Sequence, residues 1–160
     1  MAVIDASVAV ALVNAQEKEH ASCWMWFEEA RWADEPVSAP AILLSELAAA
    51  LSRGMGDAAL ARRVVQQWSS SGLIELVPVT IGLAEQAAAI AADHRIRGCD
   101  AVYVALADLS GDALVTLYRQ QLERGAAVAA VRRPKCRSGS RLPGSQPGDE
   151  KGYRPLVLQV

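Results

Sequence analysis

The sequence has no apolar run that approaches the ~20 residues needed to cross a membrane, although 52% of its residues are hydrophobic. Cysteine is also scarce, because Cys23, Cys99 and Cys136 form an odd set without a Cys-x-x-Cys pair. We therefore expect reduced thiols in a cytoplasmic protein that has no membrane role, no disulfide framework and no zinc site. The start of the chain has neither a basic segment nor a small-residue cleavage pattern, so we expect no signal peptide.

Positive charge is scarce in most of the chain. Residues 1–131 hold 9 Lys or Arg against 16 Asp or Glu, whereas residues 132–160 hold 7 basic and 2 acidic residues. A nucleic acid would therefore be held by local basic groups or by metal ions, because a uniformly basic surface is not available. Glycine-rich loops of the Gly-x-Gly-x-x-Gly and Walker types are also absent, which disfavours a nucleotide-binding protein.

Short apolar runs alternate with helical patterns in the first 131 residues, and a chain of 160 residues can bury one sizeable core. We predict strands at Ala2–Asp5, Val37–Ala39, Leu73–Val79, Ala113–Leu117 and Ala127–Val131. We predict helices at Ser7–Val13, Glu17–Trp32, Ala41–Arg53, Ala58–Ser70, 80–96, Asp100–Leu109 and Arg119–Arg124. Strands separated by helices indicate an α/β fold with a central, mostly parallel sheet of four to five strands and helices on both faces.

The texture of the sequence changes near residue 132. Residues 134–155 contain four prolines and four glycines without an apolar period. We therefore predict a folded domain at residues 1–131 and a basic, flexible tail rich in Pro, Gly and Ser at residues 132–160.

Three acidic residues stand where a carboxylate is unusual. Asp5 closes an apolar strand, and parallel sheets bind ligands at the carboxyl ends of their strands. Glu46 interrupts an apolar helical pattern, and Asp100 opens another. Each also has a purely structural interpretation: Asp5 as a turn former, Glu46 as a solvent-facing residue, and Asp100 as an acid stabilised by the helix dipole.

The order of the motifs resembles that of a known family. Val3-Ile4-Asp5-Ala6-Ser7 is followed by Ala39-Pro40, by Ser45-Glu46-Leu47, by Asp100-Ala101-Val102-Tyr103 and by Leu114-Val115-Thr116. These segments are similar to the successive motifs of PIN domains, and especially to those of the VapC-type toxins of bacterial toxin–antitoxin pairs. The resemblance extends over residues 1–131. It implies a metal-dependent endoribonuclease that acts on RNA, pairs with a cognate antitoxin and forms a homodimer.

By this resemblance Asp5, Glu46 and Asp100 would be the catalytic acids. Asp5 and Asp100 would be the main metal ligands, Glu46 would bind the metal or hold its water, and Ser7 and Thr116 would support them. Ser7 has an alternative role as a helix N-cap. Unit charges about 4 Å apart repel by about 4 kcal/mol at an effective dielectric constant of about 20, so clustered carboxylates favour a bound cation. Oxygen ligands suit Mg²⁺ or Mn²⁺, which can activate water and offset charge on a phosphate.

One position departs from the family pattern. PIN domains usually have a further Asp two residues after the threonine, where this chain has Tyr118. A neutral phenol is a poor ligand for Mg²⁺, and Asp93, Asp108 and Asp112 offer no convincing replacement. We therefore expect a weakened nuclease, or a catalytically silent PIN domain that acts by binding RNA or an antitoxin.

Two further interpretations depend on single features. A phosphotransferase with a strand-end aspartate nucleophile would need a second acid or a later lysine, and neither stands at the expected place.

Arg62-Arg63 and Arg95-x-Arg97 are small basic pairs that could contact RNA phosphates or could be solvated helix surface.

Overall fold

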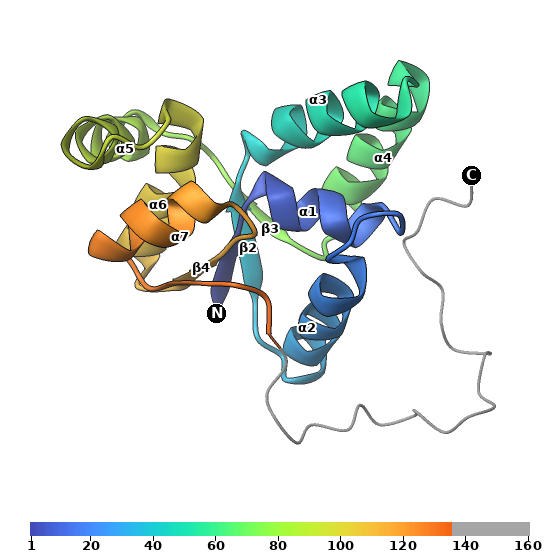
Figure 1. The fold of residues 1–160 in the computed structure, drawn as a ribbon, viewed down its shortest axis with the longest axis horizontal. Coiled ribbons are helices and arrows are strands. Elements are labelled where there is room, and N and C mark those ends of the chain that lie inside the picture. Colours follow the sequence, from blue (N-terminus) through green and yellow to red (C-terminus); the bar gives the residue numbers. More distant parts are fainter. Residues whose placement is uncertain (136–160) are drawn as a thin grey trace.

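Five parallel strands form the centre of the computed structural model, which describes residues 1–135 (Figure 1). The strands are β1 (Ala2–Ile4), β2 (Val37–Pro40), β3 (Glu75–Val77), β4 (Ala113–Val115) and β5 (Val131–Arg132). They pair in the order β3-β2-β1-β4-β5, and every pairing is parallel. This confirms the predicted mostly parallel sheet of four to five strands.

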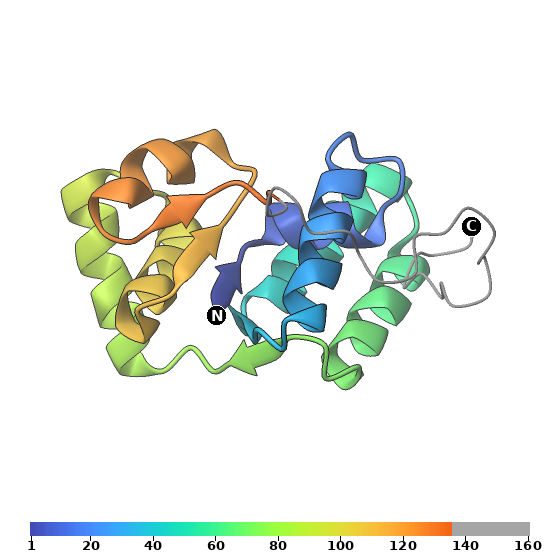
Figure 2. The ribbon, with the colours of Figure 1, turned by 90° about the horizontal axis from the view of Figure 1, so that it is seen from below.

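Helices cover the sheet on both faces. They are α1 (Ala6–Val13), α2 (His20–Trp32), α3 (Leu43–Met55), α4 (Ala58–Ser70), α5 (Ile81–His94), α6 (Gly98–Ser110) and α7 (Arg119–Arg124). Figures 1 and 2 place α1 to α4 on one side of the central strands and α5 to α7 on the other. None of the helices in residues 1–135 combines the length and the apolar character that a bilayer-spanning segment requires.

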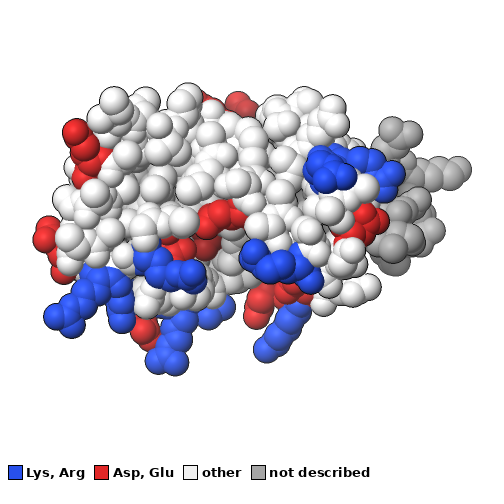
Figure 3. Space-filling model, turned by 90° about the horizontal axis from the view of Figure 1, so that it is seen from above, with Lys and Arg blue, Asp and Glu red and all other residues white. Residues whose placement is uncertain are grey.

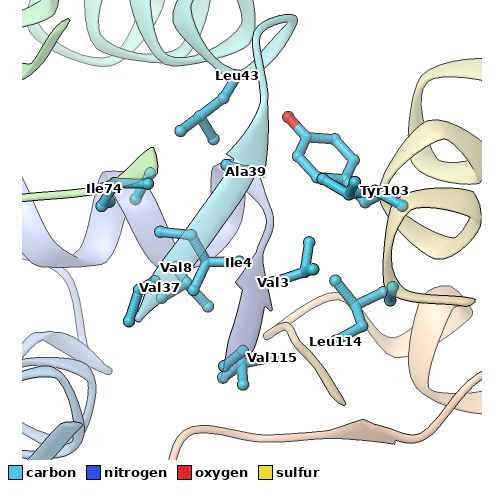
Figure 4. Close-up of a cluster of buried hydrophobic side chains, with 14 of the residues drawn as sticks. Val3, Ile4, Val8, Val37, Ala39, Leu43, Ile74, Tyr103, Leu114 and Val115 are labelled. Atoms are coloured by element: carbon cyan, nitrogen blue, oxygen red, sulfur yellow. The ribbon is translucent and has the colours of Figure 1, made fainter. Parts of the chain in front are cut away.

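The core lies around β1, β2 and the helix α6. Seven consecutive residues of α6, Ala101–Ala107, are buried because the helix contacts β1, β2 and β4 and also packs against α5. The cluster of buried side chains in Figure 4 joins Val3 and Ile4 of β1 to Leu114 of β4 and to Tyr103 of α6. An apolar helix of this kind needs cover on all sides, and its first turn carries the half-buried acid Asp100.

The last strand differs from its prediction. The Ala-rich segment Ala127–Val131 suggested a strand, but Gly125–Ala127 forms a 3₁₀ turn and β5 comprises only Val131 and Arg132. The backbone amides of Val128 and Ala129 both donate to the Gly125 carbonyl. These amides therefore form hydrogen bonds within a turn and not with a neighbouring strand of the sheet. The division at residue 131 stays a prediction, and most of the predicted tail lies outside the described residues.

The start of α3 also differs from its prediction. Pro40, which we expected in the first helical turn, is the last residue of β2, and the helix begins at Leu43. The Ala41 amide donates to the Val77 carbonyl of β3, so the sheet continues one residue further than the proline signal indicates.

Parallel pairing brings the carboxyl ends of the strands to one edge of the sheet. Beyond the ends of β1 and β4, the Asp5 amide donates to Val115 and the Thr116 amide donates to Arg132. The chain leaves this edge into α1 after β1, into α3 after β2 and into α7 after β4. Residues that follow these strands are therefore neighbours in space, which is the geometry in which open α/β sheets bind ligands.

Candidate active site

Asp5 lies at the junction of β1 and α1, and only 4% of its surface is exposed. Its Oδ1 accepts hydrogen bonds from the Ser7 hydroxyl at 2.6 Å and from the Val8 amide at 3.1 Å. Its Oδ2 accepts from the Thr116 hydroxyl at 2.7 Å. Burial raises the pKa of Asp5, and the hydrogen bonds from Ser7 and Thr116 oppose that rise. The N-cap of α1 is therefore Asp5 and not Ser7, which corrects the alternative role expected for the serine.

Ser7 and Thr116 connect Asp5 to the segment after β4. The Ser7 hydroxyl accepts from the Leu117 amide at 3.0 Å, and the Thr116 hydroxyl accepts from the Tyr118 amide at 2.8 Å. Both hydroxyl groups therefore donate to the Asp5 carboxylate and accept hydrogen bonds from backbone amides of the segment that follows β4. A fully paired network of this kind fixes the orientation of the carboxylate.

Glu46 is held by a tyrosine that the motifs do not single out. The Tyr103 hydroxyl donates to Glu46 Oε2 at 2.5 Å, and Tyr103 is only 1% exposed. Burial, and then the hydrogen bond to Glu46, raise the pKa of Tyr103 well above its usual range. The sequence feature that could have identified Tyr103 as a site residue is its spacing, because it lies three residues after Asp100 and thus on the same helix face.

Asp100, in the first turn of α6, has an oxygen without a partner. Its Oδ2 is buried and makes no hydrogen bond within the described residues. Burial raises the pKa of Asp100 to about 6, Arg97 lowers it, and the charges of Glu46 and Asp5 raise it. Asp112 Oδ2, which lies away from this site, is also buried without a partner, but the Asp100 oxygen is the one that is available to a further donor or a cation beside the other two acids.

One small pocket joins these residues. It has a volume of about 180 Å³ and is lined by Asp5, Ser7, Glu46, Arg97, Asp100, Tyr103 and Tyr118, among others. Seen from the carboxyl edge of the sheet, acidic side chains occupy the middle of the molecule, and Lys and Arg side chains lie on both sides of them (Figure 3). The structure thus brings the three predicted acids, Ser7 and Tyr118 together, and it places Thr116 in contact with Asp5.

The other acids considered from the sequence lie elsewhere. Asp108, near the end of α6, accepts a hydrogen bond from Gln86 of α5. Asp112 precedes β4, at the opposite end of the strand from Thr116. Asp93 is on α5 and is exposed. None of the three lines the pocket.

The pocket residues suit a hydrated divalent cation. Within residues 1–135 no three His, Cys, Asp or Glu side chains are arranged closely enough to share a metal ion. Mg²⁺ usually takes only one or two carboxylates and keeps several waters. Asp100 offers a buried oxygen without a partner, and Glu46 faces the same pocket. Asp100 and Glu46 are therefore the two carboxylates of this pocket that could hold such an ion together with its waters.

A larger groove opens beside the pocket. It has a volume of about 690 Å³ and lies between α1 and α3, with Val10, Glu17, Ala49 and Arg53 among its lining residues. Ser7 and Glu46 line both cavities. Glu46 is therefore accessible from this groove as well as from the smaller pocket.

Solved structures share the fold. VapC20 from Mycobacterium tuberculosis, described as a sarcin-ricin loop cleaving toxin, has a TM-score of 0.66 at 24% identity, with 84% of this chain and 100% of that one covered. FitAcB from Neisseria gonorrhoeae has a TM-score of 0.64 at 20% identity, with coverages of 84% and 98%. VapBC2 from Rickettsia felis, bound to a promoter DNA fragment, has a TM-score of 0.63 at 13% identity, with coverages of 82% and 97%.

Comparison of sequences gives the family. No curated protein matches the sequence at a significant level. The model of the PIN domain family matches residues 2–125, which is most of the chain and includes Asp5, Glu46, Asp100, Thr116 and Tyr118. The chain belongs to the PIN domain family.

Proposed function

We propose that this protein is a metal-dependent endoribonuclease of the VapC toxin type. The observation that carries the proposal is the meeting of three carboxylates at one pocket that contains a buried carboxylate oxygen without a partner. The carboxylates come from the junction of β1 and α1, from α3 and from α6. Mg²⁺ or Mn²⁺ would be held by Asp100 and Glu46. Asp5, which the family resemblance made a main ligand, would stand beside them, because both of its carboxylate oxygens accept hydrogen bonds within the chain. When bound, the cation supplies an activated water and offsets the charge of a phosphate.

The chain's own residues orient the site. Ser7 and Thr116 fix the Asp5 carboxylate, and Tyr103 fixes that of Glu46. Positioned groups of this kind lower the cost of assembling a reaction geometry. The groove between α1 and α3 offers room for RNA on one side of the pocket.

The structural relatives support a partner protein. Similar folds include a toxin–antitoxin complex from Klebsiella pneumoniae, with 84% of this chain covered at 16% identity and a TM-score of 0.58. We infer that an antitoxin binds this chain and that the chain forms a homodimer in the cytoplasm.

Cleavage of single-stranded RNA tests the proposal. We expect cleavage with Mn²⁺ or Mg²⁺, none in EDTA, and a loss of at least about a hundredfold in Asp5→Asn, since removal of one electrostatic group in an active site costs this much. If cleavage persists in EDTA or survives Asp5→Asn at the wild-type rate, the carboxylates are not the catalytic groups.

A second candidate function follows from Tyr118, which lines the pocket where a carboxylate would add a ligand. In that case the protein binds RNA or an antitoxin without cutting. Absence of cleavage with any divalent ion, together with retained RNA or partner binding, favours this alternative. Tyr118→Asp then separates the two cases further, because an added carboxylate lowers the Mn²⁺ concentration needed for cleavage if the site is one ligand short. An unchanged requirement shows that the tyrosine is not limiting.

A further inference from the structure

Apart from the three carboxylates and the hydroxyl groups that donate to them, two polar side chains line the pocket. Arg97 is the residue before α6, and Tyr118 is the residue before α7. Both line the pocket, Arg97 is exposed, and Tyr118 is 37% exposed. They come from segments 21 residues apart in the sequence but line the same pocket, and the interaction with the Tyr118 side chain raises the pKa of Arg97.

The backbone on either side of this pair is fixed. The Tyr118 amide donates to the Thr116 hydroxyl, which itself donates to Asp5. Arg97 accepts through its carbonyl from the Ala101 amide, in the first turn of α6. The backbone that carries these two side chains is therefore tied by hydrogen bonds to the segments that hold Asp5 and Asp100.

Arg97 is the one cation that lines the pocket, against three carboxylates. It makes no salt bridge, because the two ion pairs among residues 1–135 are Arg31–Glu28 and Arg119–Glu123. Its guanidinium carries five donors, and the contact with Tyr118 leaves most of them open. An exposed guanidinium with open donors, beside a pocket that otherwise repels anions, is suited to a phosphate.

We propose that Arg97 binds a phosphate of the RNA strand at the edge of the carboxylate pocket and that Tyr118 holds the guanidinium in place for this contact. The choice of RNA as the ligand rests on the proposed function. An arginine can bind a phosphate through two parallel hydrogen bonds, and its charge reduces the repulsion between the phosphate and the three carboxylates. Arg97 is thus a substrate-binding residue and Tyr118 a positioning residue.

Binding of a labelled single-stranded RNA tests this proposal. The full-length chain carrying Glu46→Gln is used with Mg²⁺, so that the RNA stays intact, and Arg97→Gln is added to it. We expect about tenfold weaker binding and a decrease of about 0.7 in the slope of log affinity against log salt, the value for one phosphate contact on a single strand. Arg119→Gln is the matched control, because it removes the same charge one residue from Tyr118 but from an arginine already paired with Glu123.

A double-mutant cycle tests the role of Tyr118. We expect Tyr118→Phe alone to weaken RNA binding about threefold, and to add nothing once Arg97→Gln is present, because the two side chains act as a unit. Thermal denaturation of each variant checks that the fold is intact.

Three results would overturn the proposal: equal effects of Arg97→Gln and Arg119→Gln, additive effects of Arg97→Gln and Tyr118→Phe, or no RNA binding by the parent protein. Absence of cleavage with RNA binding and its Arg97 dependence intact would remove the nuclease function and leave this contact in place.

Discussion

Asp100 carries the least satisfied atom of the site. Its Oδ2 is buried without a hydrogen-bond partner, and burial raises the pKa of the carboxyl group to about 6 from its usual 3.8. Without a cation, the ionised form is therefore disfavoured in the folded protein relative to the unfolded chain. Unfolding releases this constraint, so the residue couples the stability of the fold to pH.

Replacing Asp100 by Asn should stabilise the metal-free protein at neutral pH. Because the folded-state pKa lies above the unfolded value, the stability contributed by the protonated carboxyl is fully present below about pH 3.8 and is lost as pH rises through about 6. In EDTA we expect Asp100→Asn to melt at a higher temperature than the wild type at pH 7, and we expect the difference to shrink toward pH 4.

The control for this prediction is Asp93→Asn, which removes an exposed carboxylate on the neighbouring helix. It should leave the melting temperature unchanged across the same range. A wild type that is more stable than Asp100→Asn at pH 7 in EDTA would show that the carboxylate is well satisfied without metal.

Tyr103 offers a second test at the scale of one residue. Tyr103→Phe removes the hydroxyl that donates to Glu46 and leaves the buried ring in place. A hydrogen bond to a charged group stabilises by roughly 1.5–3 kcal/mol, and partial exposure of Glu46 places the expected loss at the lower end. We expect a small decrease in the free energy of unfolding in urea and about tenfold slower RNA cleavage. Cleavage at the wild-type rate would exclude a positioning role for this hydroxyl.

At the scale of the element, the N-cap residue of α1, Asp5, has two roles. Asp5 caps the helix through the bond from the Val8 amide and also faces the pocket. Asp5→Asn keeps a cap acceptor, whereas Asp5→Ala removes it at a cost of about 1 kcal/mol. We expect both variants to lose RNA cleavage and only Asp5→Ala to lose this stability in urea denaturation. Equal stability of the two variants would show that the cap contributes nothing.

The elements that define the edge of the sheet could be predicted from sequence. An apolar strand that ends on Asp5, and a helix pattern interrupted by Glu46, both follow from periodicity and from chain order. Parallel pairing then brings the ends together without further information. The short strand β5 could not be predicted this way, because Ala127–Val131 is apolar in composition but the turn at Gly125 satisfies its backbone locally.

The sequence predicted where the acidic residues lie on the strands and helices, but it did not predict which side chains they contact. In the sequence, Tyr103 is one more large residue in an apolar helical pattern. Only the fold shows that its hydroxyl donates to Glu46, which lies 57 residues earlier in the chain. Arg97 stands out in the sequence only as half of a basic pair, and its contact with Tyr118 depends on where α6 and α7 begin. Contacts between distant segments are set by the fold and leave no local pattern.

At the scale of the whole molecule, charge is divided between two parts of the chain. Residues 1–131 are acidic and residues 132–160 are basic. We propose that residues 1–135 fold on their own. Removal of residues 136–160 should leave the melting temperature unchanged, weaken RNA binding and reduce its salt dependence, because that segment carries a net positive charge. A lower melting temperature in the truncated chain would contradict the predicted division.

The central claim is that the carboxylates at the carboxyl edge of the sheet form a nuclease site. Single-turnover cleavage of a labelled single-stranded RNA in Mn²⁺ tests it most directly, with wild type, Asp100→Asn and Asp93→Asn compared side by side. We predict cleavage by the wild type and by Asp93→Asn, and a loss of at least about a hundredfold in Asp100→Asn, although that variant folds at least as stably. Equal cleavage by all three proteins would contradict the claim.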